Sequence, residues 1–178
     1  PMFHAHGLFV ALHCAMLSGC EVRFLPRFSV DAVLRELTDC TVMMAVPTMY
    51  SRLMADTRFN RAACAHMRLF TSGSAPMTAA THRELHDRTG HHILERYGMT
   101  EAGMITSNPL EGERVAGTVG FALPDYELRV TTESGVCEVG QPGMVEVRGP
   151  HLFAGYWGQP EKTASEFRDD GFFVTGDL

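Results

Sequence analysis

The chain has 178 residues, 45% of them hydrophobic and 20% charged, a composition typical of a globular protein that buries a core. Its 15 basic and 21 acidic side chains give a net charge of −6, which argues against a nucleic-acid partner because that needs a basic surface. The five cysteines are odd in number and form no C-x-x-C pair, so the sequence indicates neither a disulfide framework nor a zinc site and favours a reducing compartment.

Residues 1–20 carry no Asp, Glu, Lys or Arg, which raises the question of a membrane segment. Histidines and glycines interrupt this stretch, whereas a spanning helix needs about 20 predominantly apolar residues. The stretch also lacks the basic start and the small-residue cleavage site of a secretory signal. We therefore expect no membrane span, and a buried segment of a protein in the cytoplasm or, in a eukaryote, in an organelle matrix.

Strands and helices alternate in the first half of the chain. The apolar pattern predicts the strands 21–25, 41–46, 69–71 and 92–96 and the helices 8–17, 30–37, 48–54 and 79–89. Ser29 and Thr78 are suited to cap helix N-termini, and Gly19 is suited to end the first helix. This order predicts a parallel sheet with covering helices, whose ligands bind beyond the carboxyl ends of the strands. The loops 72–76 and 97–101 would then open at the same edge.

The sequence pattern changes after about residue 110, where glycines separate short apolar runs. Runs such as 128–130 and 144–147 predict antiparallel strands joined by turns. We therefore assign residues 1–110 to an α/β subdomain and residues 111–178 to a smaller antiparallel β subdomain of the same domain.

The stretch 95–101, Glu-Arg-Tyr-Gly-Met-Thr-Glu, is the strongest chemical motif. A glycine at a strand end lets the backbone turn, and a hydroxyl and a carboxylate follow. Tyr97 offers an aromatic face to a base, Thr100 a hydroxyl to phosphate oxygens, and Glu101 a carboxylate to Mg²⁺. The alternative is an ordinary strand-to-helix turn with Thr100 as N-cap, because short motifs often match by chance.

Three further groups have two interpretations each. The loop 72–76, Ser-Gly-Ser-Ala-Pro, could seat a planar ring or be an ordinary loop, and a serine nucleophile is disfavoured because no G-x-S-x-G elbow is present. His4 and His6 would share one side of an extended segment, where they could face an anion or belong to the core. His82 and His86 have zinc-ligand spacing on a helix, but no third ligand accompanies them, so we expect a solvated helix face.

Five stretches together resemble, in order and spacing, the motifs of the acyl-adenylate-forming superfamily, which contains acyl-CoA synthetases, luciferases and adenylation domains. They are 1–7 (PMFHAHG), 72–76 (SGSAP), 97–101 (YGMTE), 155–156 (GY) and 175–177 (TGD), and they cover essentially the whole chain. The segments 66–70, 94–97 and 167–173 are most similar to the malonyl-CoA synthetase branch.

The resemblance implies a fragment of a large N-terminal domain. The phosphate loop of the family would lie upstream of Pro1, and the C-terminal domain with its lysine would lie beyond Leu178. The chain alone would therefore be inactive. One local departure from the family pattern is Leu123-Pro124-Asp125, where a Pro-Gly turn is common.

The resemblance also implies an ATP-dependent acid–CoA ligase of fatty acid metabolism. A carboxylate attacks the α-phosphate of ATP to give an acyl-adenylate and pyrophosphate, and the thiol of CoA then displaces AMP. ATP and CoA are thus co-substrates, with Mg²⁺ as the metal. His4, Thr100 and Glu101 correspond to catalytic positions, with Glu101 holding Mg²⁺. The implied nucleotide-binding residues are Gly73, Ser74, Ala75, Glu95, Tyr97, Gly98, Thr100 and Asp177, with Tyr97 stacking on adenine and Asp177 accepting hydrogen bonds from the ribose.

A malonate-like acid brings a second carboxylate, which needs a cation or a strong donor because burying it unpaired costs several kcal/mol. Arg96 is the main candidate, since a guanidinium offers two parallel donors to a carboxylate. His6 is the second candidate, and Met99 completes the expected acid-binding set. The alternative role for Arg96 is an ion pair with Glu95 or Glu101.

Two other functions stay open: a non-catalytic nucleotide-binding remnant, and a ligase for another short- or medium-chain acid. The polar residues Thr100, Glu101 and Asp177 argue against the remnant, because a decayed site would lose side chains that bring no packing benefit.

Overall fold

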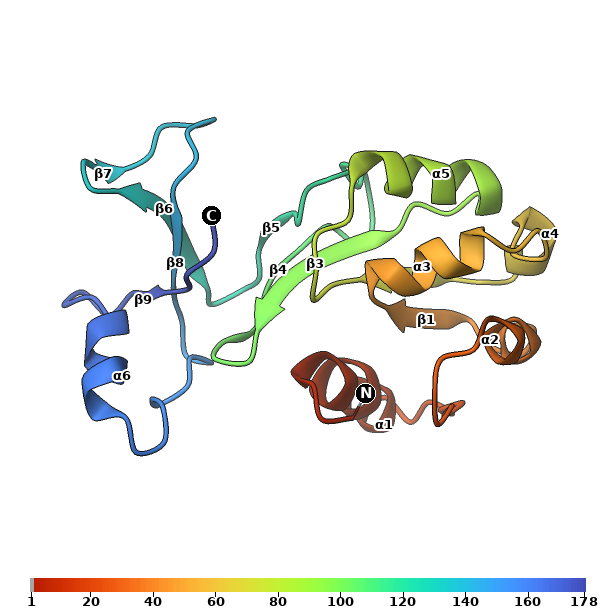
Figure 1. Cartoon of the computed structure of the whole chain (residues 1–178), viewed down its shortest axis with the longest axis horizontal. Coiled ribbons are helices and arrows are strands. Elements are labelled where there is room, and N and C mark those ends of the chain that lie inside the picture. Colours follow the sequence, from red (N-terminus) through yellow and green to blue (C-terminus); the bar gives the residue numbers. More distant parts are fainter. Residues whose placement is uncertain (1) are drawn as a thin grey trace. The chain divides into compact units, whose positions relative to one another are not determined.

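The computed structural model describes residues 2–178, which divide into two compact units (Figure 1). The first unit comprises the chain up to Gly98 together with Thr106–Phe121. The second unit comprises Met99–Ile105 together with Ala122–Leu178.

Helices and strands alternate along the chain as follows. The helices are η1 (His6–His13, a π-helix), α1 (Cys14–Leu17), α2 (Val30–Leu37), α3 (Pro47–Met54), α4 (Arg61–Cys64), α5 (Ala79–Thr89) and α6 (Pro160–Glu166). The strands are β1 (Val42–Ala45), β2 (Leu69–Ser72), β3 (Leu94–Met99), β4 (Gly103–Ser107), β5 (Phe121–Ala122), β6 (Glu127–Thr132), β7 (Gly135–Val136), β8 (Met144–Arg148) and β9 (Phe173–Val174).

A five-stranded sheet has the order β1-β2-β3-β4-β5. Strands β1 and β2 pair in parallel, with Val42 opposite Leu69, and β2 pairs in parallel with β3. The predicted parallel arrangement is therefore confirmed for these three strands, and β2 and β3 reach the same edge of the sheet with their carboxyl ends.

The core of the first unit lies between this sheet and helices α2, α3 and α5. Its apolar side chains include Leu37, Leu53, Phe70 and Leu85, all with at most 3% of their surface exposed. The buried Tyr50 hydroxyl donates a 2.7 Å hydrogen bond to the Thr71 carbonyl, which ties α3 to β2. This core fixes the strand ends that carry the candidate site.

The first predicted helix forms, but it is not buried. Gly19 has a φ of +65° and the Cys20 N–H donates to the Ala15 carbonyl at 2.9 Å, so the glycine ends the helix as expected. Met16 and Leu17 are 63% and 85% exposed. The expectation of a buried segment is wrong because, among residues 2–178, little covers the outer face of this helix.

The predicted helix starts are confirmed. The Ser29 side chain accepts a hydrogen bond from the Ala32 N–H at 3.5 Å, and Thr78 accepts one from the Thr81 N–H at 3.1 Å. These side chains satisfy backbone donors that have no partner within their helices.

Two expectations about strands are wrong. Residues 21–25 form no strand, because no other strand of the described chain pairs with them. Gly98 does not break β3, which continues to Met99, and the turn 100–102 then leads into β4 rather than into a helix. Thr100 is therefore not an N-cap.

The second unit contains a four-stranded antiparallel sheet of order β7-β6-β8-β9, as predicted from the glycine-punctuated pattern. Before β6, the Tyr126 N–H donates to the Leu123 carbonyl at 3.1 Å and Asp125 has a φ of +70°. A positive φ at the third residue of a turn favours glycine, which explains why a Pro-Gly turn is common there.

Together these two sheets confirm the predicted fold class, an α/β sheet followed by a smaller antiparallel β region. All five cysteines are unpaired. Within residues 2–178, no helix combines the length and the apolar character that crossing a membrane requires.

Candidate active site

The loop after β2 passes close to the neighbouring strand. Gly73 is buried, and a Cβ placed on it would lie 3.3 Å from the Arg96 carbonyl oxygen and 3.6 Å from the His6 ring. Ser74 follows with a φ of +65°, and Ser74 and Ala75 are exposed. A side chain at position 73 would press on the Arg96 backbone and the His6 ring, so the glycine lets this loop pack closely against β3.

His6 joins this loop from the start of η1. Its Nδ1 atom lies 3.0 Å from Ser74 Oγ. Burial, and then the charge of Arg96, lower the pKa of His6, so its ring is neutral at pH 7. His4 is exposed, and its carbonyl accepts the Leu8 N–H at 2.9 Å. The expectation of an extended segment for His4 and His6 is wrong, because helical backbone begins here.

Arg96 lies half-buried on β3. Its Nη2 donates to Thr71 Oγ1 at 3.3 Å. Burial lowers the pKa of Arg96, and the groups that favour its charge are Cys14 and Tyr50. Among the described residues no carboxylate pairs with it, so the guanidinium can accept an anionic ligand.

The Glu95 carboxylate is turned away from Arg96. Its Oε1 lies 2.9 Å from His82 Nδ1 and accepts the Gly117 N–H at 3.3 Å. An ion pair between Arg96 and Glu95 is thereby excluded. The next two residues, Tyr97 and Gly98, are half-buried on β3.

The expectation of a solvated face for His82 and His86 is wrong. His82 is 2% exposed, and His86 stacks on His92 with ring centroids 3.8 Å apart. The α5 face that carries them packs toward β3, where Glu95 pairs with His82. Among residues 2–178, no group of three His, Cys, Asp or Glu side chains could hold a metal ion.

In the second unit, the turn after β3 presents Thr100 and Glu101. Met99 ends the strand, Thr100 is exposed, and Glu101 is half-buried. The Glu101 backbone carbonyl accepts the Phe153 N–H at 2.7 Å, and its Oε1 accepts the Tyr156 hydroxyl at 3.1 Å. A single carboxylate fits Mg²⁺ bound mainly to water and substrate phosphates, which is how proteins commonly hold this ion.

Asp177 lies in an exposed turn after β9 whose backbone is fixed from β8. The Val145 N–H donates to the Asp177 carbonyl at 2.9 Å, and the Asp177 N–H donates to Thr175 Oγ1 at 3.1 Å. Thr175 Oγ1 in turn donates to the Val145 carbonyl at 2.8 Å. Strand β8 therefore holds the position of Asp177.

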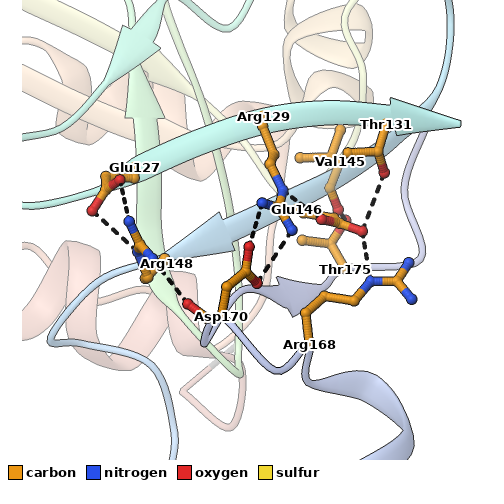
Figure 2. Close-up of polar contacts among 9 residues, drawn as sticks. All are labelled: Glu127, Arg129, Thr131, Val145, Glu146, Arg148, Arg168, Asp170 and Thr175. Atoms are coloured by element: carbon orange, nitrogen blue, oxygen red, sulfur yellow. Dashed lines mark hydrogen bonds and ion pairs between the residues drawn. The ribbon is translucent and has the colours of Figure 1, made fainter. Parts of the chain in front are cut away.

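Next to Val145 on β8, Glu146 is the centre of a charged network (Figure 2). The residue is 1% exposed, and its carboxylate accepts hydrogen bonds from Arg129 Nε at 2.7 Å, Arg168 Nε at 2.8 Å and Thr131 Oγ1 at 3.1 Å. Asp170 also binds Arg129. This network was not predicted from the sequence, in which the charged residues on alternate positions of β6 and β8 are its signal.

Comparisons with known proteins agree on one family. A family model described as AMP-binding enzyme matches residues 1–157. The malonate–CoA ligase of Arabidopsis thaliana is 38% identical over 199 residues, which cover 99% of this chain and 32% of that protein. This chain spans about a third of the length of the curated relatives it matches.

Two solved structures are similar over 99% of this chain. ATP-bound MatB from Rhodopseudomonas palustris is 53% identical with a TM-score of 0.96, over 35% of its own chain. A malonyl-CoA ligase with methylmalonyl-CoA and AMP bound is 43% identical with a TM-score of 0.89, over 39% of its own chain. The chain therefore belongs to the AMP-binding enzyme family, the acyl-adenylate-forming superfamily that its motifs resemble.

Proposed function

We propose that the protein to which this chain belongs is an ATP-dependent acid–CoA ligase that forms malonyl-CoA or methylmalonyl-CoA. Similarity to a malonate–CoA ligase and to a malonyl-CoA ligase that binds methylmalonyl-CoA and AMP supports this. We expect both acids to be substrates, because one methyl group changes discrimination in a pocket by only about 1 kcal/mol.

The observation that carries the proposal is the environment of Arg96. This half-buried guanidinium lies beside β2, close to His6, with no carboxylate partner among the described residues. Even a half-buried cation without a counter-ion loses part of its hydration, and a ligand carboxylate would offset that cost. We assign Arg96 to the distal carboxylate of the acid, and we propose His6 and Met99 as further acid-binding residues.

The remaining roles follow the order of the motifs. Gly73, Ser74 and Ala75 line the adenine pocket with Gly98, and Tyr97 stacks on the base. Glu95 was expected to bind the nucleotide, but its buried carboxylate pairs with His82, so we assign it to the support of β3 instead. Asp177 binds the ribose hydroxyls, Thr100 contacts the phosphates, and His4 lies beside the acyl group. Mg²⁺, when bound at Glu101, supplies positive charge to a crowded phosphate. The chain's own residues bind and orient the acid and the nucleotide for in-line attack.

We further propose that residues 1–110 and 111–178 are the acid/adenylate-binding part and the β-rich part of one N-terminal domain. The lysine-bearing C-terminal domain of the same protein is its expected partner, and the chain alone is expected to be inactive. The unpaired cysteines favour the cytoplasm or an organelle matrix.

The test is pyrophosphate release by the full-length protein with ATP, CoA and a series of mono- and dicarboxylic acids. We expect the highest kcat/KM with malonate or methylmalonate, and low values with acetate, propionate and butyrate. A monocarboxylate as best substrate would contradict the assignment of the acid. ATP binding without turnover of any acid would favour the non-catalytic remnant.

A further inference from the structure

A tyrosine hydroxyl lies between two carboxylates in the second unit. Tyr156 Oη is 3.1 Å from Glu101 Oε1 and 2.8 Å from Glu166 Oε2. A phenol has one proton, so it can make one strong donated hydrogen bond at a time. The partner of that proton decides whether the Glu101 carboxylate is held.

Glu166 already has another partner. Lys162, one helical turn earlier on α6, donates to Glu166 Oε1 at 2.7 Å, and its ammonium lies 4.2 Å from the centre of the Tyr156 ring. Hydrogen bonds from Lys162 and Tyr156 lower the pKa of Glu166. Because Lys162 balances the charge of Glu166, it reduces the repulsion between Tyr156 Oη and Glu166 Oε2, 2.8 Å apart, when the phenol turns its proton to Glu101.

The phenol itself stays protonated and well fixed. A phenol is protonated at neutral pH, so the hydroxyl is a donor to the two carboxylates beside it. The Tyr156 N–H donates to Thr163 Oγ1 at 2.9 Å, and the ring packs edge-on against Phe153 at 4.8 Å.

The same short segment also holds the backbone of Glu101. The Phe153 N–H donates to the Glu101 carbonyl at 2.7 Å, three residues before the tyrosine that holds the side chain. Residues 153–156 thus form hydrogen bonds with both the backbone carbonyl and the side-chain carboxylate of Glu101. A carboxylate that binds a metal needs a partner that fixes its orientation, and outer partners of this kind strongly affect metal binding.

We propose that Tyr156 is a positioning residue for Glu101, and that its hydroxyl orients this carboxylate toward the Mg²⁺ of the nucleotide complex. The inference rests on the proposed function, in which Glu101 is the metal-binding carboxylate. The competing explanation is that Tyr156 only stabilises α6 through Glu166.

The test compares variants of the full-length protein in two assays. The first is Mn²⁺ binding, followed by electron paramagnetic resonance, in the presence of α,β-methylene-ATP. The second is pyrophosphate release as a function of Mg²⁺, with the thermal melt recorded for each variant. Glu101→Gln gives the reference for complete loss of the carboxylate.

Tyr156→Phe should weaken Mn²⁺ binding about tenfold, the effect expected for loss of one hydrogen bond to a charged group. Its Mg²⁺ requirement should rise by the same factor. Glu166→Gln should keep Mn²⁺ binding at the wild-type level, because the glutamine amide can donate to the phenol oxygen and leave its proton to Glu101. The matched control is Tyr126→Phe, which removes a hydroxyl that donates to the carbonyl of Ala102, next to Glu101. This control should lower the melting temperature without changing Mn²⁺ affinity.

Unchanged Mn²⁺ affinity in Tyr156→Phe would overturn the inference while leaving the proposed function intact. Equal weakening in Tyr156→Phe and Tyr126→Phe would also overturn it, because it would show a general loss of structure. If the wild-type protein bound Mn²⁺ with the analogue but turned over no acid, the proposed function would fail and the binding arm would still decide the role of Tyr156. No Mn²⁺ binding by the wild-type protein would overturn the inference, and pyrophosphate release with Mg²⁺ would then decide the proposed function by itself.

Discussion

His82 Nδ1 lies 2.9 Å from Glu95 Oε1, and both side chains are almost completely buried. The pair joins α5 to β3 at the residue before Arg96. Glu95 therefore lies on the opposite face of the strand from Arg96 and on the same face as Tyr97, since successive side chains on a strand alternate between faces.

Glu95→Ala should lower the free energy of unfolding by about 3–5 kcal/mol, because it leaves a buried histidine without its partner. Glu95→Gln keeps an acceptor for His82 and should cost about 1 kcal/mol. Urea unfolding measures both, and Glu84→Ala on the exposed side of α5 is the matched control, expected within about 0.5 kcal/mol of wild type. Normal stability of Glu95→Ala with loss of ATP binding would instead make Glu95 a direct nucleotide contact.

From the Glu146 network we expect the free energy of unfolding to decrease at acidic pH. Burial opposes the charge of Glu146, but hydrogen bonds from Arg129, Arg168 and Thr131 outweigh it and hold the pKa of this carboxyl below its ordinary value. A group with a lowered folded-state pKa stabilises the protein above its unfolded pKa, near 4.3, and loses that contribution as pH falls through the folded-state value.

Glu146→Gln should therefore lower the free energy of unfolding by about 2 kcal/mol at pH 7. This is less than the loss expected for a fully buried pair, because the arginines remain partly in water. The difference from wild type should shrink below about pH 4, where Glu146 of the wild-type protein also becomes neutral. Urea unfolding at pH 7 and pH 3.5 measures this difference in the free energy of unfolding, and Glu133→Gln in the exposed β6–β7 turn is the control. A difference that stayed constant across this pH range would show that the charge of Glu146 is not what stabilises the sheet.

Local chemistry explains which parts of the fold could be predicted. The starts at Ser29 and Thr78 and the end at Gly19 depend on interactions within a few residues, so the sequence alone predicted them. The failed strand 21–25 depends on a distant pairing partner, which a local pattern does not reveal.

The candidate site shows the same division. The motif residues, the stretch 155–156 included, were found because each stretch is contiguous. The contact between Tyr156 and Glu101 was not predicted, because the two residues are 55 positions apart and meet only in the folded chain. His82 was misjudged because its polar character suggested solvent, while its partner Glu95 lies on another element. In both cases the hydrogen-bond partner is distant in the sequence.

Asp177→Ala should weaken ATP binding much more than acid binding. Its backbone hydrogen bonds from Val145 and to Thr175 do not involve the side chain, so the turn should keep its shape. Isothermal titration with ATP and KM values for malonate measure the two effects in the full-length protein. Loss of one charged acceptor predicts ATP binding weaker by about tenfold or more. Equal weakening of ATP and malonate would count against a ribose contact.

Arg96→Ala tests the acid itself. If the guanidinium binds the distal carboxylate through two charged hydrogen bonds, its loss should reduce kcat/KM for malonate by about 100-fold or more. The shortened side chain also opens space, so the ratio of kcat/KM for butyrate to kcat/KM for malonate should rise above its wild-type value. Arg96→Lys keeps the charge but loses the two parallel donors of the guanidinium. Its kcat/KM for malonate should lie between the values of the wild-type protein and Arg96→Ala.

The matched control for this series is Arg68→Ala, an exposed arginine just before β2 that should leave malonate turnover unchanged. Thermal melts of Arg96→Ala should stay close to wild type, because the side chain makes a single 3.3 Å hydrogen bond to Thr71 in the described chain. Malonate turnover with an unchanged KM in Arg96→Ala would remove this residue from the acid site. His6, which lies beside Ser74 with a neutral ring, would then be the donor to test by the same substitution.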